Sequence, residues 1–86
     1  MEMERTRRLI AQSQQGDEAA RSQLVEVNLP LVHSIARRFV DRGVEFEDLL
    51  QIGSLGLLKA IRDFDLNYEV KFSTFAVPKI IGEIKQ

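Results

Sequence analysis

The stretch FEDLLQIGSLGLLKAIRDFD (residues 46–65) decides the fold, because it has the spacing of an amphipathic helix with two glycines inside it. At about 100° per residue one stripe is apolar and predicts the core face, and it comprises Phe46, Leu50, Gly53, Leu57, Ile61 and Phe64, with Leu49 and Ala60 on its edge. A glycine inside a helix costs about 1 kcal/mol relative to alanine. We therefore expect Gly53, and Gly56 on the flank of the stripe, to let neighbouring helices approach closely.

The opposite side of this predicted helix is apolar as well. Leu55 lies opposite Phe46, with Leu58 and Ile52 on either side. The polar residues around them are Asp48, Gln51, Lys59 and Arg62. An apolar patch with a polar rim is typical of a protein-binding surface. Alternatively, another helix of the same domain covers it, but in so small a domain the other helices already have the core stripe to cover.

The rest of the chain also has helical patterns, so we predict an all-α fold, a compact small bundle of about four to five helices. Helices are expected at residues 2–15, 18–27, 29–41 and 46–65, with a last one from about residue 73 to the end. The expected caps and breaks are Gly16 after the first helix, Asp17 and Asn28 as N-caps, Pro30 in a first turn, Arg42-Gly43 as a stop, Ser73 as the last N-cap, and Pro78 as a kink or break.

Composition excludes several classes of function. The chain has 86 residues, no cysteine and a single histidine, His33, so disulfides, thiolate metal sites and Cys–His catalysis are excluded. No catalytic motif surrounds any serine, so we expect no enzyme, no cofactor, no metal and no small-molecule substrate. No apolar run reaches the roughly 20 residues that span a bilayer, and the N-terminus lacks a signal peptide. We therefore expect a cytoplasmic protein with no membrane contact.

The segment KFSTFAVPK (residues 71–79) interleaves aromatic rings with hydroxyls and lysines. Aromatic rings beside cations can stack on unpaired bases while holding the phosphate backbone. In this segment Phe72 and Phe75 alternate with Ser73 and Thr74, and Lys71 and Lys79 flank them. Alternatively, two phenylalanines three residues apart on a helix belong to the core. The net charge of −1 is also unlike that of a stand-alone nucleic-acid binder.

The run NLPLVHSIARRFVDRGVEFEDLLQIGSLGLLKAIRDFDLNYEVKFSTFA (residues 28–76) strongly resembles region 2 of bacterial RNA polymerase sigma factors. The resemblance extends to about Lys85 and depends on an ordered series of motifs: RG, DLxQxGxxGL, FD and KFST-aromatic-A. The ending AVPKIIGEIK is similar to the sporulation and general-stress sigma factors of Gram-positive spore formers. Within one single domain, we expect lead-in helices at residues 1–27 and the region 2 core at residues 28–86. The chain stops inside a helical pattern, so we expect it to be truncated.

The resemblance implies a central helical hairpin, made by the third and fourth helices, that docks on the clamp helices of the largest subunit of core RNA polymerase. The contacts implied by position are Leu29, Val32, Asp48, Gln51, Ser54 and Leu58, with Glu47 and Ile52 beside them. Leu55 joins this surface by helical geometry. The subgroup also implies that an anti-sigma factor binds the same hairpin.

The resemblance further implies that residues 71–79 help to recognise and melt the minus-ten promoter element by holding the unpaired non-template strand within the holoenzyme. Phe75 matches the position that stacks on a flipped adenine, supported by Phe72, Thr74 and Lys71. Pro78 and Lys79 replace two tryptophans of the housekeeping factors, so we expect weaker or more selective strand separation. The chain alone should bind polymerase or an inhibitor without directing transcription. The alternative function is a helical protein-interaction domain with no nucleic-acid contact.

Overall fold

The computed structural model of the chain describes residues 2–86, without the side chains of Glu2 and Arg42. The elements are α1 (Glu2–Gln14), α2 (Glu18–Ala36), a 3-10 helix η1 (Arg37–Arg42), α3 (Phe46–Asp63) and α4 (Phe72–Lys85), and residues 2–86 contain no strand. None of these helices is long and apolar enough to cross a bilayer. The predicted all-α bundle is confirmed.

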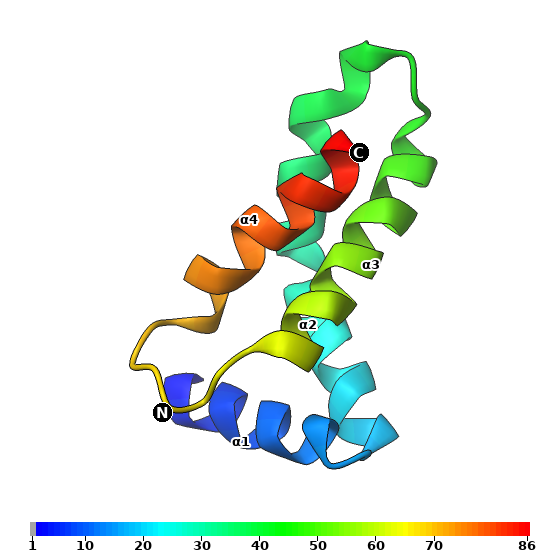
Figure 1. The fold of residues 1–86 in the computed structure, drawn as a ribbon. Coiled ribbons are helices and arrows are strands. Elements are labelled where there is room, and N and C mark those ends of the chain that lie inside the picture. The colour runs from blue at the N-terminus through cyan, green and yellow to red at the C-terminus, as the bar shows by residue number, and fades with distance from the viewer. Residues whose placement is uncertain (1) are drawn as a thin grey trace.

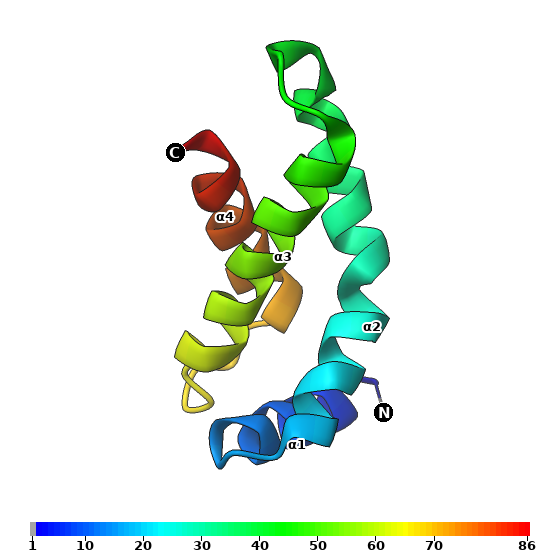
Figure 2. The ribbon, with the colours of Figure 1, turned by 90° about the vertical axis from the view of Figure 1, so that its right-hand side faces the viewer.

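The helices are arranged around α3. Helices α2 and α3 run antiparallel as the expected hairpin, and α4 runs back along α3 (Figures 1 and 2). Helix α1 lies across the end of this group that is far from the hairpin turn (Figures 1 and 2). The last turn of α3 and the start of α4 therefore lie near α1.

The turn between α1 and α2 has the predicted local chemistry. Gly16 has φ of 102°, in the left-handed region that favours glycine after a helix. Asp17 is the N-cap of α2, and its Oδ1 accepts a hydrogen bond from the Ala20 N–H at 3.1 Å. Both expectations for this turn are confirmed.

The predicted break between residues 27 and 29 is wrong, because α2 is continuous through Pro30. Asn28 is not an N-cap; its Nδ2 donates to the Leu24 carbonyl at 2.8 Å, one turn back within the same helix. A proline inside a helix costs about 3 kcal/mol. Burial of Leu24, Val32 and Ile35 on both sides of Pro30 offsets that cost. The expected boundary between lead-in helices and core therefore falls inside a helix.

The hairpin turn and the last helix depart from the prediction in detail. The third predicted helix ends as a 3-10 segment, and Gly43 with φ of 83° closes it as expected. Helix α4 begins at Phe72 with Lys71 at the N-cap position, so Ser73 is not the cap. Helix α4 also continues through Pro78 without a break, since Ala76 and Ile80 on either side are fully buried.

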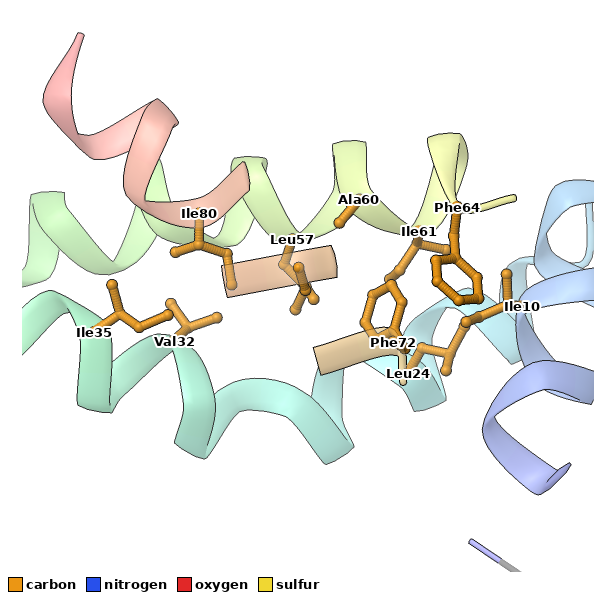
Figure 3. Packing of buried hydrophobic residues seen from close by; sticks show 11 residues of the cluster. Ile10, Leu24, Val32, Ile35, Leu57, Ala60, Ile61, Phe64, Phe72 and Ile80 are labelled. Atoms are coloured by element: carbon orange, nitrogen blue, oxygen red, sulfur yellow. The ribbon is translucent and has the colours of Figure 1, made fainter. Parts of the chain in front are cut away.

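The core joins all four α-helices, and the predicted stripe of α3 contributes Leu57, Ala60, Ile61 and Phe64 to it (Figure 3). Its largest fully buried side chains are Ile10, Leu24, Val32, Leu57, Ile61 and Ile80. The two glycines of α3 permit this packing. A β-carbon on Gly53 would lie 2.9 Å from Val32 Cγ1, and one on Gly56 would lie 2.8 Å from the Ile80 Cα. The predicted close approaches are confirmed, with Gly53 facing α2 and α4, and Gly56 facing α4.

Candidate functional site

The back of α3 is exposed, as the interpretation of a binding surface requires. Leu55 and Leu58 are 47% and 37% exposed, although a helix of the same domain could have covered them. Together with Gln51, Ser54 and the edge of Leu50 they line one shallow depression. We call Gln51, Ser54, Leu55 and Leu58 the α3 patch. Within residues 2–86 both leucines therefore keep more than a third of their surface exposed.

A second depression continues the α3 patch toward α1. Leu55 and Leu58 lie on its α3 side, and Gln14 and Arg21 lie on the side of α1 and α2. The sequence pattern of α3 could not show this extension, because it depends on how α1 crosses the end of the bundle. The apolar surface is therefore bordered by a basic residue, Arg21, that sequence reasoning missed.

The other residues predicted for this surface lie outside the two depressions. Glu47 and Asp48 are exposed in the first turn of α3, and Ile52 is half-buried. Leu29 is 38% exposed on α2, outside both depressions.

The structure corrects the prediction that Val32 belongs to the polymerase-binding surface. Its side chain is completely buried and faces Gly53, where α2 and α3 come closest. It therefore stabilises the hairpin from inside and is not available to a partner while the fold is intact.

Ion pairs tie α4 to the flank of α3. Lys59 Nζ lies 2.8 Å from Glu83 Oε1, and Lys79 Nζ lies 3.6 Å from Asp63 Oδ2. Arg62 Nε donates to Asp63 Oδ1 at 2.7 Å. This hydrogen bond, with the positive charges of Arg62 and Lys79, lowers the pKa of Asp63 from 3.8 to about 2.

Three phenylalanine rings form a cluster where α3 passes into α4. The Phe64 ring contacts the Phe72 ring at a centroid distance of 5.5 Å and an interplanar angle of 86°. It contacts the Phe75 ring at 5.5 Å and 60°. Both contacts have the edge-to-face geometry that aromatic pairs prefer. We call Phe64, Phe72 and Phe75 the aromatic cluster.

The predicted nucleic-acid-binding residues separate into buried and accessible ones. Phe72 is only 6% exposed, so it packs against Phe64 in the core and cannot itself stack on a base. Phe75 is half-buried, and Lys71, Thr74 and Lys79 are exposed.

Thr74 and Lys79 lie beside the Phe75 ring, whereas Lys71 lines a separate depression with Arg7 of α1. Lys79 Nζ lies 5.4 Å from the ring centroid, within the range of a cation–π contact. Thr74, Phe75 and Lys79 line a shallow depression with Val70 and Pro78. Sequence reasoning did not place Val70 in this site, because it precedes α4 in a turn and only the fold brings it beside Phe75.

Residues 2–86 contain no group of three or more His, Cys, Asp or Glu side chains placed to hold a metal ion. His33 is exposed and its ring contacts the edge of Phe46 at a centroid distance of 5.7 Å. This contact gives His33 a packing role between α2 and α3 of the hairpin.

The family Sigma-70 region 2 matches residues 24–86 of the chain, which covers the α3 patch and the aromatic cluster. The chain therefore belongs to the sigma-70 family through region 2, and the assignment made from the sequence is confirmed. The match begins within α2, four residues before the expected start of the core.

Similar proteins include sigma-F and sigma-G factors of Priestia and Bacillus. The RNA polymerase sigma-F factor of Priestia megaterium is 58% identical over 78 residues, which are 91% of this chain and 31% of that protein. The sigma-F factor of Bacillus subtilis gives the same identity and shares. The sigma-G factor of Bacillus subtilis is 52% identical over 84 residues, which are 96% of this chain and 32% of that protein. The chain thus spans about a third of the length of these relatives.

Proposed function

We propose that this chain is a module of a transcription initiation factor, with no catalytic activity of its own. It binds core RNA polymerase through the α3 patch and presents Phe75, the accessible ring of the aromatic cluster, to the unpaired non-template strand of the minus-ten element. The observation that carries the proposal is the exposure of Leu55 and Leu58 on a helix whose other face fills the core, in a chain of the sigma-70 family.

The α3 patch suits a helical partner. Two leucines with hydroxyl and amide groups beside them offer apolar contacts that a helix can cover, with a polar rim that sets the register. The partner proposed is the pair of clamp helices in the largest polymerase subunit. An anti-sigma factor that occupied the same leucines would compete with polymerase. Exchange of Leu55 and Leu58 for aspartate should then abolish inhibitor binding, and retention of that binding would place the inhibitor elsewhere.

The surface around Phe75 suits a single strand of DNA. Its half-buried ring can stack on a base, and Lys71 and Lys79 carry the charge that phosphates require. The net charge of −1 supplies no general attraction to DNA, so this contact depends on the polymerase holding the strand nearby. The similar proteins are named sigma-F and sigma-G factors, which supports placing this chain in the subgroup of sporulation and general-stress sigma factors. We infer that it acts in the cytoplasm together with RNA polymerase.

The first test measures binding of the chain to a peptide that reproduces the clamp helices. Wild type is compared with Gln51→Ala and Leu55→Asp in the α3 patch. The control is Val27→Asp, because Val27 is 57% exposed on α2 and lies outside both depressions. We expect micromolar binding that both patch variants abolish and the control retains. Equal binding of Leu55→Asp and wild type would contradict the proposal.

A rival function is a helical interaction domain that never contacts nucleic acid, and the burial of Phe72 is the observation that favours it. This rival predicts that Phe75→Ala leaves every binding partner unaffected. The proposed function predicts that the same variant keeps polymerase binding and loses strand binding.

A further inference from the structure

The outer face of α3 carries opposite charges at its two ends. Glu47 and Asp48 are exposed in the first turn, and neither has an ion-pair partner among the described side chains. Arg62 lies in the last turn with a side chain that is 67% exposed, and Arg21 of α2 borders the same end of the face. The face is therefore acidic at one end and basic at the other, with the exposed Leu55 between them.

Leu55 lies at the midpoint between these charges. Asp48 precedes it by seven residues and Arg62 follows it by seven. Seven residues are close to two full turns of an α-helix, so the three side chains leave α3 on the same side. The same spacing places one negative and one positive charge at equal distances from the apolar centre of the face.

Two copies of such a face are complementary when the two α3 helices pair antiparallel about a two-fold axis at Leu55. Residues equally far before and after Leu55 then lie level with each other, so Asp48 of each copy faces Arg62 of the other. A parallel pairing would instead set like charges against each other at both ends. Charge complementarity therefore favours one direction and one register of pairing.

Arg62 can accept a second carboxylate although it already pairs with Asp63. Its Nε and Nη2 donate to the two carboxylate oxygens of Asp63 at 2.7 Å and 3.0 Å. A guanidinium has five N–H donors, so further donors remain for Asp48 of a second copy. Arg21 adds a second positive charge beside Arg62, so this end of the face stays basic despite Asp63.

The α3 patch also has the shape that an opposing helix requires. Its four residues, Gln51, Ser54, Leu55 and Leu58, follow the spacing i, i+3, i+4, i+7 and line one shallow depression. Four residues at this spacing form the hole that receives a side chain of the facing helix in a coiled coil. A leucine of a second α3 matches this hole in size and polarity, and the pairing would remove both exposed leucines from water.

We propose that two copies of this chain pair through antiparallel α3 helices, so that the second copy covers the α3 patch until polymerase displaces it. The displacement by polymerase rests on the proposed function of the α3 patch, whereas the pairing itself does not. The paired segment, residues 48–62, is about 22 Å long, which is too short for the interface area of a permanent dimer. The pairing should therefore be weak, with a Kd on the order of 100 µM, and it can yield to a tighter partner.

The test measures dimerisation by sedimentation equilibrium after charge reversal at either end of the face. In the proposed dimer Asp48→Lys sets cation against cation, and Arg62→Glu sets anion against anion. Each variant alone should therefore dimerise at least about tenfold more weakly than wild type. An equimolar mixture of the two variants should regain the wild-type affinity, because every cation of one variant then faces an anion of the other.

The matched control is the pair Glu69→Lys and Arg8→Glu. Both residues are exposed outside α3, and the two changes alter the net charge by the same amounts as the α3 variants do. Each control variant should dimerise as wild type does, and mixing the two should add little. Recovery of pairing in the mixture of α3 variants also shows that both are folded, so loss of the fold cannot imitate the expected result.

Two outcomes would overturn the inference. One is a wild-type chain that stays monomeric up to about 1 mM. The other is a mixture of Asp48→Lys and Arg62→Glu that pairs no better than either variant alone, which would place any dimer interface elsewhere.

Addition of the clamp-helix peptide distinguishes this inference from the proposed function. Dissociation of the dimer by the peptide would support both. Peptide binding to a chain that never dimerises would reject the inference alone. A dimer that binds the peptide without dissociating would retain the pairing and reject the proposed site of polymerase docking.

Discussion

Gly56 lies directly against the backbone of Ile80, so closely that a β-carbon on Gly56 would sit 2.8 Å from the Ile80 Cα and 3.0 Å from the Lys79 carbonyl oxygen. This close approach lets α4 pack directly on α3. A side chain could yield by rotation, but a helix backbone yields only by moving the whole element.

The glycines therefore predict a graded series of stabilities. Gly56→Ala should lower the free energy of unfolding by about 2–3 kcal/mol, because the obstacle is backbone. Gly53→Ala should cost about 1 kcal/mol, because its obstacle is the Val32 side chain and the helix gains propensity. Gly82→Ala should stabilise by about 0.5–1 kcal/mol, since no atom lies within 4 Å of its new β-carbon. Urea unfolding measures all three, and a stable Gly56→Ala would contradict the packing described.

Much of α3 could be predicted from the sequence, because the helical repeat alone separates its two faces. The core stripe around Leu57 and Ile61, the exposed Leu55, and the close approaches at Gly53 and Gly56 all follow from one period of 3.6 residues. The local signals at Gly16, Asp17 and Gly43 were also correct, whereas the caps predicted at Asn28 and Ser73 were not.

What the sequence could not show depends on tertiary contacts. Asn28 and Pro30 have the local chemistry of a helix start, and only burial of Leu24 and Val32 on both sides makes the continuous helix favourable. The amide Nε2 of Gln14 donates to the carbonyls of Ile61 and Phe64, which lie 47 and 50 residues away, so no local pattern predicts these contacts.

Phe72 and Phe75 should separate stability from strand binding. Phe72→Ala should lower the free energy of unfolding by about 3–4 kcal/mol, because the ring is almost completely buried. Phe75→Ala should cost less stability, since the ring is half-buried, but should weaken strand binding by the polymerase complex, as loss of about 1–3 kcal/mol of stacking would. Phe75→Tyr keeps the ring and serves as the control. Strand binding that survives Phe75→Ala would favour the interaction domain without nucleic acid.

Asp17 should contribute to stability through one hydrogen bond at the start of α2. Asp17→Ala removes the acceptor for the Ala20 N–H and should cost about 1 kcal/mol in urea unfolding. Asp17→Asn retains a side-chain oxygen at the same place and should be nearly neutral. If both substitutions cost the same, the negative charge near the helix dipole, rather than the cap, would be the main contribution.

Because of Asp63, the free energy of unfolding should depend on pH in the acid range. Its pKa falls to about 2 in the folded chain, from 3.8, chiefly through the hydrogen bond from Arg62, with the charges of Arg62 and Lys79 adding to it. A carboxyl whose pKa is lower in the folded state stabilises the fold above its unfolded pKa, so the contribution is complete above about pH 4 and is lost as the pH falls through about 2.

Urea midpoints measured between pH 5 and pH 2 should therefore fall more steeply for wild type than for Asp63→Asn. Glu69→Gln, which removes one negative charge from an exposed position, controls for net charge and should follow wild type. Parallel curves for wild type and Asp63→Asn would mean that the ion pairs of Asp63 persist equally in the unfolded chain.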